Sequence, residues 1–160
     1  MLRRIVRLTA GGLDDVENLL IGIGGQVTRI FDVDGTVVRQ GAPPDEFTHA
    51  VNRAIGLLED LQQVDRAIPL TNGAERGVPR LVSRGNKPWT TRRRLGISRT
   101  DRVVVVGDQV LTDGVLARRL AIAFIHLVID DRKEPPAQVR LRRRGRWFER
   151  LLFKPSPPSR

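Results

Sequence analysis

Short apolar runs rich in β-branched residues recur along the chain, and most of them end at an acidic or turn-forming residue. Residues 27–33 (VTRIFDV) run directly into Asp34 and Gly35, which predicts a buried strand that ends at an acidic turn. The run at 102–106 (RVVVV) is the clearest strand, and it is followed by Gly107 and Asp108. Further strands are predicted at 66–70, 80–83 and 123–128.

Two segments between these runs show helical spacing. In residues 43–63, apolar side chains recur every three or four positions behind Pro43 and Pro44, which predicts an amphipathic helix. A shorter helix is predicted from about Thr112 to Leu120. Strands that alternate with helices favour an α/β fold, and we expect a three-layer, Rossmann-like, doubly wound parallel sheet with right-handed crossovers. In such a sheet, ligands bind at the carboxyl ends of the strands.

The last part of the chain has a different pattern. Residues 139–153 (VRLRRRGRWFERLLF) predict a helix that Gly145 weakens and Pro155 ends, with its apolar residues clustered on one side. One interpretation is a final helix that docks on the sheet, and the other is a basic amphipathic segment that lies on anionic lipid. We therefore expect a core at 1–138, a basic segment at 139–153 and a disordered Pro-rich tail at 154–160.

The composition limits the possible chemistry. The 160 residues suffice for one compact domain, and their 40% hydrophobic and 29% charged content is ordinary for a globular protein without a membrane span. The chain has no cysteine and only His49 and His126, so we expect oxygen ligands for any catalytic metal. Acidic residues interrupt what would be the apolar stretch of a signal peptide, which favours an unprocessed cytoplasmic protein.

The net charge of +10 indicates anionic partners, such as nucleic acid, acidic lipid or a phosphorylated substrate. This charge is concentrated in Arg92, Arg93 and Arg94 and in the segment 139–153. The excess of arginine beside Trp147 and Phe148 leaves open a peripheral contact with an anionic membrane at its inner face.

Carboxylates at the predicted strand ends suggest a metal site. Asp32 and Asp34 lie two positions apart, so at the end of an extended strand both face the same pocket. With Asp108 they form a hard oxygen site suited to Mg²⁺. A carboxylate can also attack phosphorus and form an aspartyl phosphate. Thr71 and Lys87 would then supply a hydroxyl group and a cation for the phosphoryl oxygens.

Four motifs occur in the order DVDGT, LTNG, NKPW and GDQVLTD, and in this order the chain resembles the haloacid dehalogenase superfamily. The resemblance implies a magnesium-dependent phosphatase with Asp32 as nucleophile and metal ligand. It implies that Asp34 is a general acid and base whose backbone carbonyl binds the metal, and that Asp108 is a further ligand. It further implies that Thr71, Asn72 and Lys87 bind the phosphate and that Lys87 is also catalytic. Asp113 would brace Asp108 or the metal's waters.

The spacing of these motifs indicates which members of the superfamily the chain resembles. The gaps from Asp34 to Thr71 and from Thr71 to Lys87 are too short for a cap domain, which predicts a capless enzyme with an open site. Over residues 13–150, the chain is similar to the phosphatidylglycerophosphate phosphatase-like family of subfamily III A. It departs from that family at Gly35, where asparagine is usual, and in residues 72–86, where the family has a full helix.

Three functions remain open. The first is hydrolysis of phosphatidylglycerophosphate or a similar lipid phosphomonoester, and the second is hydrolysis of a soluble nucleotide or sugar phosphate. The third is nucleic-acid or ribosome binding by a catalytically weak protein of the same fold. The net charge favours the third, whereas the complete set of Asp32, Asp34, Lys87 and Asp108 argues for retained chemistry.

Overall fold

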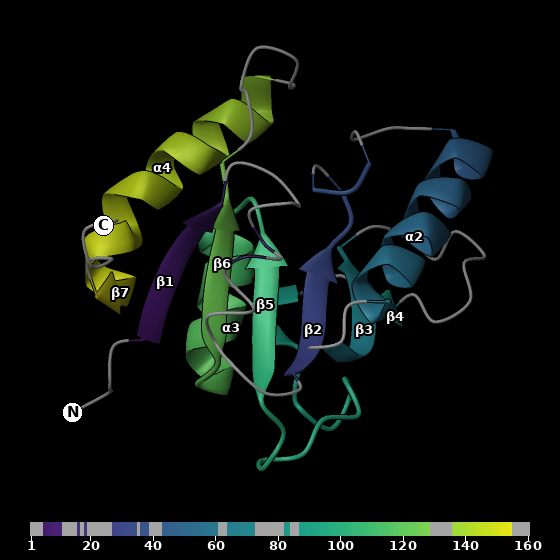
Figure 1. Ribbon diagram of the computed structural model, residues 1–160. Coiled ribbons are helices and arrows are strands. Elements are labelled where there is room, and N and C mark those ends of the chain that lie inside the picture. Colours follow the sequence, from purple (N-terminus) through teal and green to yellow (C-terminus); the bar gives the residue numbers. More distant parts are fainter. Residues whose placement is uncertain are drawn as a thin grey trace.

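A computed structural model describes residues 5–10, 16, 18, 27–34, 36–38, 43–60, 64–72, 82–83, 87–128 and 136–154. Its strands form one parallel sheet in the order β4-β3-β2-β5-β6-β1-β7, drawn side by side in Figure 1. The strands are β1 (Ile5–Ala10), β2 (Val27–Asp32), β3 (Val64–Thr71), β4 (Val82–Ser83), β5 (Val103–Gly107), β6 (Ala123–Leu127) and β7 (Phe153–Lys154). The predicted α/β fold with a parallel sheet is therefore confirmed.

The order of the strands resembles that of a Rossmann-like sheet. If β2 is counted as the first strand, the order from β4 to β6 is 3-2-1-4-5. The chain reverses its direction across the sheet between β2 and β5, which pair directly with Ile30 opposite Val105. Ligands bind at such a reversal, outside the carboxyl ends of the two strands.

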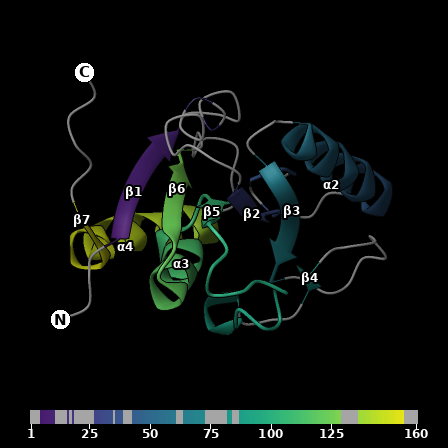
Figure 2. The same ribbon diagram turned by 60° about the horizontal axis from the view of Figure 1, so that its bottom comes forward.

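Helices cover both faces of the sheet, as Figure 2 shows for α2 (Pro44–Glu59) and α3 (Val115–Leu120). Phe47 and Val51 of α2 pack in one apolar cluster with Phe31. Leu116 of α3 packs in a second cluster with Ile30, the neighbour of Phe31. Successive strand residues point to opposite faces, so each face of β2 has its own core. Two short helical turns, η1 (Lys87–Trp89) and η2 (Val110–Gly114), follow β4 and β5.

The C-terminal helix α4 (Pro136–Leu152) lies beside β1 and β7 in Figure 1. It packs against η2 at Gly145, where an added Cβ would lie 3.2 Å from the Cβ of Val110. The helix continues through Gly145, which was predicted to weaken it, and the absence of a side chain there allows α4 to approach η2 closely. Phe153, just after α4, is buried in the second cluster. One side of the predicted tail helix therefore docks on the core.

The remaining sequence predictions differ from the structure mainly at element ends. The helix predicted at 43–63 runs from Pro44 to Glu59, and the tail helix begins three residues earlier than predicted, at Pro136. Strand β1 was not predicted. Lys154 was assigned to the disordered tail but pairs with Val6. Residues 155–160 and the shortened segment at 73–81 lie outside the described residues. None of the described helices is both long and apolar enough to span a bilayer.

Candidate active site

The parallel register brings three of the predicted site residues to one edge of the sheet. Asp32 is the last residue of β2, and it pairs with Leu70, next to Thr71 at the end of β3. Asp108 directly follows β5, whose Val106 lies opposite Phe31. Because β2 is hydrogen-bonded to both β3 and β5, these ends are adjacent, as the sequence predicted.

Three buried carboxylates converge at this edge. One oxygen each from Asp32, Asp108 and Asp113 lies within 4.8 Å of the others. Lys87, at the start of η1, forms ion pairs with Asp32 and with Asp113, the second at 3.0 Å. Lys87 is only 3% exposed, so its ammonium group faces carboxylates rather than bulk water. Residues from three distant motifs thus form one charged cluster in the interior.

Burial and mutual repulsion change the protonation of this cluster. Loss of hydration raises the pKa of Asp32 well above its usual value, and the nearby Asp113 raises it further, although Lys87 opposes both effects. The pKa of Asp113 is raised for the same first reason. Burial by itself lowers the pKa of Lys87, but the carboxylates of Asp113 and Asp32 outweigh burial, so that its pKa is raised. The lysine therefore stays charged, whereas ionised carboxylates are costly.

Asp34 has a different environment. It is half-buried and lies just beyond β2, where it forms an isolated bridge with Val38. The Thr71 hydroxyl donates a hydrogen bond to Asp34 Oδ2, so the threonine orients this carboxylate. Asn72 is exposed, and its side-chain oxygen accepts a hydrogen bond from the Lys87 backbone N–H at 2.8 Å. Asn72 thus positions the start of η1, which carries the lysine.

The backbone after β5 fixes the two carboxylates of the last motif. The Asp113 side chain accepts a hydrogen bond from the Gln109 N–H at 3.2 Å, which folds the carboxyl group back toward the strand end. A Cβ on Gly107 would lie 2.8 Å from the Cβ of Asp113, so only glycine leaves room for this conformation. His126 of β6 lies 3.2 Å from the Asp108 backbone oxygen through its Nε2 atom.

Two contacts of Asp108 were not predicted from the sequence. Arg142 of α4 binds Asp108 Oδ2, with Nε at 2.8 Å and Nη2 at 2.6 Å. The Thr36 hydroxyl lies 3.5 Å from the other oxygen, Oδ1. Thr36 is the threonine of the DVDGT motif, so its position could have been noticed. Arg142 is one of several arginines in the tail, and nothing in the local sequence distinguishes it.

The donor set fits a hard divalent cation. Three carboxylates face two cationic side chains, Lys87 and Arg142, which leaves the cluster with a formal charge of −1 when all five groups are ionised. A further positive charge would favour the ionised form of Asp32, whose pKa is raised first by burial and then by repulsion from Asp113. Carboxylate oxygens without histidine or cysteine are the ligands that Mg²⁺ prefers. Asp32 and Asp108, together with the backbone near Asp34, could hold such an ion.

Comparisons with protein-family models, with curated proteins and with solved structures found no match to this chain.

Proposed function

We propose that this protein is a Mg²⁺-dependent phosphomonoesterase of the haloacid dehalogenase superfamily that forms an aspartyl phosphate on Asp32. The observation that carries the proposal is the convergence of Asp32, Asp108 and Asp113 around Lys87 at the strand ends. Buried acids with raised pKa values beside a fixed cation are typical of functional sites. The order of the four motifs in the sequence supports the same chemistry.

The two acids at the end of β2 suit different roles. Asp32 is buried beside Lys87, so an oxygen of its carboxylate can attack phosphorus while the lysine binds phosphoryl oxygens. Asp34 is half-buried and oriented by Thr71, which suits a group that exchanges protons with a leaving group and with water. Mg²⁺, when bound, supplies the charge that favours ionised Asp32 and offsets the charge of the phosphate.

The bonds change in two steps. In the first, Asp32 forms a bond to phosphorus as the ester P–O bond breaks, and the leaving oxygen takes the proton of Asp34. In the second, Asp34 accepts a proton from water, whose oxygen bonds to phosphorus as the Asp32–phosphorus bond breaks. Inorganic phosphate is released, and both carboxyl groups return to their starting states.

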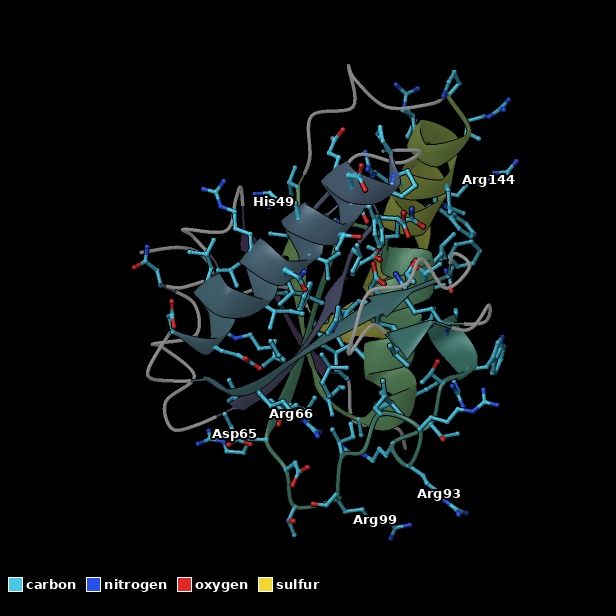
Figure 3. All side chains as sticks on the ribbon, turned by 90° about the vertical axis from the view of Figure 1, so that its right-hand side faces the viewer. His49, Asp65, Arg66, Arg93, Arg99 and Arg144 are labelled. Carbon is cyan, nitrogen blue, oxygen red and sulfur yellow. The ribbon has the colours of Figure 1, made fainter. Side chains whose placement is uncertain are left out.

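We infer a capless enzyme of subfamily III A that acts on phosphatidylglycerophosphate or a similar lipid. Among the described residues between Asp34 and Thr71, α2 packs on the sheet and leaves no helix for a separate cap. The outer side of α4 supports a lipid substrate, since Trp147 is 73% and Leu151 is 61% exposed. Exposed arginines on the same helix, such as Arg144 in Figure 3, would favour an anionic surface.

The test is Mg²⁺-dependent phosphate release from phosphatidylglycerophosphate in vesicles, compared with release from nucleotide and sugar monophosphates. We expect the lipid to be the best substrate and Asp32→Asn to lose at least about a thousandfold in kcat. Asp65→Asn, which removes an exposed carboxylate from β3, is the matched control and should keep full activity. Turnover by Asp32→Asn within a few-fold of the wild-type rate would exclude Asp32 as the nucleophile.

Two alternatives predict different results from the phosphate-release assay and from a separate measurement of RNA binding. Faster turnover of soluble monophosphates with no effect of vesicles would indicate a nucleotide or sugar phosphatase. No turnover of any ester, with salt-dependent RNA binding, would indicate a nucleic-acid-binding protein. The positions of the arginines favour the enzyme over a nucleic-acid-binding protein. Arg93 and Arg99 lie at the end of the molecule opposite Arg144 in Figure 3, so these three arginines do not share one basic surface. Arg92, in addition, binds the Leu120 carbonyl at 2.9 Å.

A further inference from the structure

Arg142 is the one tail arginine that the structure places inside the candidate site, among the tail residues whose side chains are described. It is 7% exposed, whereas Arg143 and Arg144, the next two residues of α4, are exposed. Its guanidinium group binds Asp108 Oδ2 through both Nε and Nη2, across 34 positions of the sequence. The close approach of α4 at Gly145 brings the arginine to this depth.

A purely structural role explains this burial poorly. Removing a guanidinium and a carboxylate from water costs several kcal/mol per ion, so replacing such a pair with apolar residues is often neutral or stabilising. The C-terminal end of α4 is already anchored to the core by apolar contacts, because Leu152 packs against the second cluster and Phe153, the next residue, is buried in it. The fold therefore does not need an arginine at this position to dock the helix.

The chemistry of the group points to a ligand. An arginine side chain stays protonated in proteins, so Arg142 adds a permanent positive charge beside the three acids. The planar guanidinium fork matches the oxygens of a phosphate, and it binds them through two parallel hydrogen bonds. The same group competes with a divalent cation for Asp108, because both bind the same carboxylate.

We propose that Arg142 is a ligand-selecting residue of this site, which weakens the binding of divalent cations at Asp108 and strengthens the binding of phosphate. This inference rests on the proposed phosphatase function. Arg142 and Lys87 are two cations from different elements, and they bind different acids: Arg142 of α4 binds Asp108, and Lys87 of η1 binds Asp32 and Asp113. With a cation bound at Asp108, the guanidinium group of Arg142 would contribute to binding the phosphoryl oxygens of the substrate.

The proposal predicts effects of opposite sign for the two ligands. Loss of the positive charge in Arg142→Gln should tighten Mg²⁺ binding and weaken the binding of inorganic phosphate, each by about tenfold. Arg142→Lys keeps the charge but loses the fork, so its Mg²⁺ affinity should stay near the wild-type value while phosphate binds several-fold more weakly. Arg143→Gln removes the same charge from the exposed neighbour and should change neither affinity by more than about twofold.

Isothermal titration of the full chain with MgCl₂, and then with inorganic phosphate at saturating Mg²⁺, measures both affinities without turnover. Thermal melts of each variant show whether it folds, and Arg142→Lys provides the test if Arg142→Gln does not fold. A wild-type protein that binds Mg²⁺, with the same two affinities in the Arg142 variants, would overturn this inference and leave the proposed function standing. Weakening of both ligands together would also overturn it. A wild-type protein that binds neither ligand at millimolar concentration would overturn the proposed function and this inference with it.

Discussion

At the scale of single residues, the protonation state that the fold favours differs from the one that the proposed reaction needs. Asp32 is buried beside two other acids, and its environment favours the neutral form, yet the proposed reaction needs its ionised form. Lys87 offsets part of this cost through its ion pair with Asp32. Catalytic groups are commonly held in such unfavourable surroundings, and their replacement by neutral residues often stabilises the protein. This conflict makes the pH dependence of stability a useful measurement.

Asp32→Asn should stabilise the metal-free protein near neutral pH. A carboxyl group whose pKa is raised by folding binds its proton more tightly in the native state than in the unfolded state. The free energy of unfolding therefore falls as the pH rises above about 3.9, the pKa of aspartate in the unfolded chain. Asparagine cannot ionise and removes that part of the slope. Urea unfolding in EDTA measures this from mildly acidic to neutral pH. The free energy of unfolding of the variant should increase relative to that of wild type as the pH rises. A variant that is less stable at every pH would show instead that the ionised pair with Lys87 is net stabilising.

Gly107→Ala should damage the site through sterics alone. The new Cβ would overlap the Asp113 side chain, so either the carboxyl group or the strand end must move. We expect a loss of about 1–3 kcal/mol in the free energy of unfolding, together with weaker Mg²⁺ binding. Gly56→Ala in α2 is the control, because its Cβ meets nothing within 4 Å. That control should gain about 0.5–1 kcal/mol, because alanine favours a helix interior. Equal stability of the two variants would refute the packing argument.

At the scale of elements, α4 has two sides with different chemistry. Its inner side carries Arg142 into the site and seats Gly145 on η2. Its outer side presents Trp147 and Phe148, whose rings meet edge to face with centroids 4.7 Å apart. The two interpretations of the tail drawn from the sequence therefore concern opposite sides of the same helix. The docked side is observed, and lipid binding by the other side stays a prediction.

Replacing the outer apolar residues should separate the two sides of α4. The double variant Trp147→Ser/Leu151→Ser should lose binding to anionic vesicles but melt at nearly the wild-type temperature, because both side chains are largely exposed. Wild type should bind and then dissociate at high salt, since each basic residue near the surface contributes roughly 1 kcal/mol. Co-sedimentation with anionic and neutral vesicles measures this. Unchanged binding by the double variant, or no binding by wild type, would contradict the lipid proposal.

Truncation after Gln138 tests the inner side. It removes Phe153, which is 2% exposed, and the ion pair of Arg142 with Asp108. We expect the truncated chain to melt well below wild type whether or not lipid is present, because buried apolar area is lost. A truncated chain with the wild-type melting temperature would mean that α4 contributes nothing to the core.

At the scale of the whole molecule, the site joins elements from most of the chain. Its carboxylates come from the ends of β2 and β5 and from η2, and its cations come from η1 and α4. The cluster therefore links the central strands to the last helix. Binding of an ion at this point should stabilise the fold as a unit, because an ion that binds only the native state shifts the unfolding equilibrium.

Mg²⁺ should raise the melting temperature of the full chain. At a hundredfold excess over its dissociation constant, a ligand specific to the native state contributes about 2.7 kcal/mol. Asp108→Asn, which removes one acid of the trio, should lose most of this shift, and Asp65→Asn should keep it. Differential scanning fluorimetry across millimolar MgCl₂, with EDTA as the reference, measures the effect. The same shift in wild type and Asp108→Asn would place the ion elsewhere.

The sequence by itself determined the two central strands and the acids that end them. The runs at 27–33 and 102–106 are local patterns of β-branched residues, and they form β2 and β5 with Asp32 and Asp108 at their ends. Parallel pairing then makes those ends neighbours, so the position of the acids followed from the fold class. The pattern of apolar residues in α2 likewise fixed which side of that helix is buried.

Tertiary structure alone decided what reaches the site from outside those motifs. Arg142 lies among many arginines, and its burial depends on the close approach of α4 to η2 at Gly145. β1 lies between β6 and the edge strand β7, and this pairing joins segments from both ends of the chain. Local propensity cannot encode such contacts, because they join segments that are distant in the sequence, by 34 positions for Arg142 and Asp108 and by more than a hundred for β1 with β6 and β7. Sequence patterns therefore predicted the acids, and the packed fold selected the arginine that faces them.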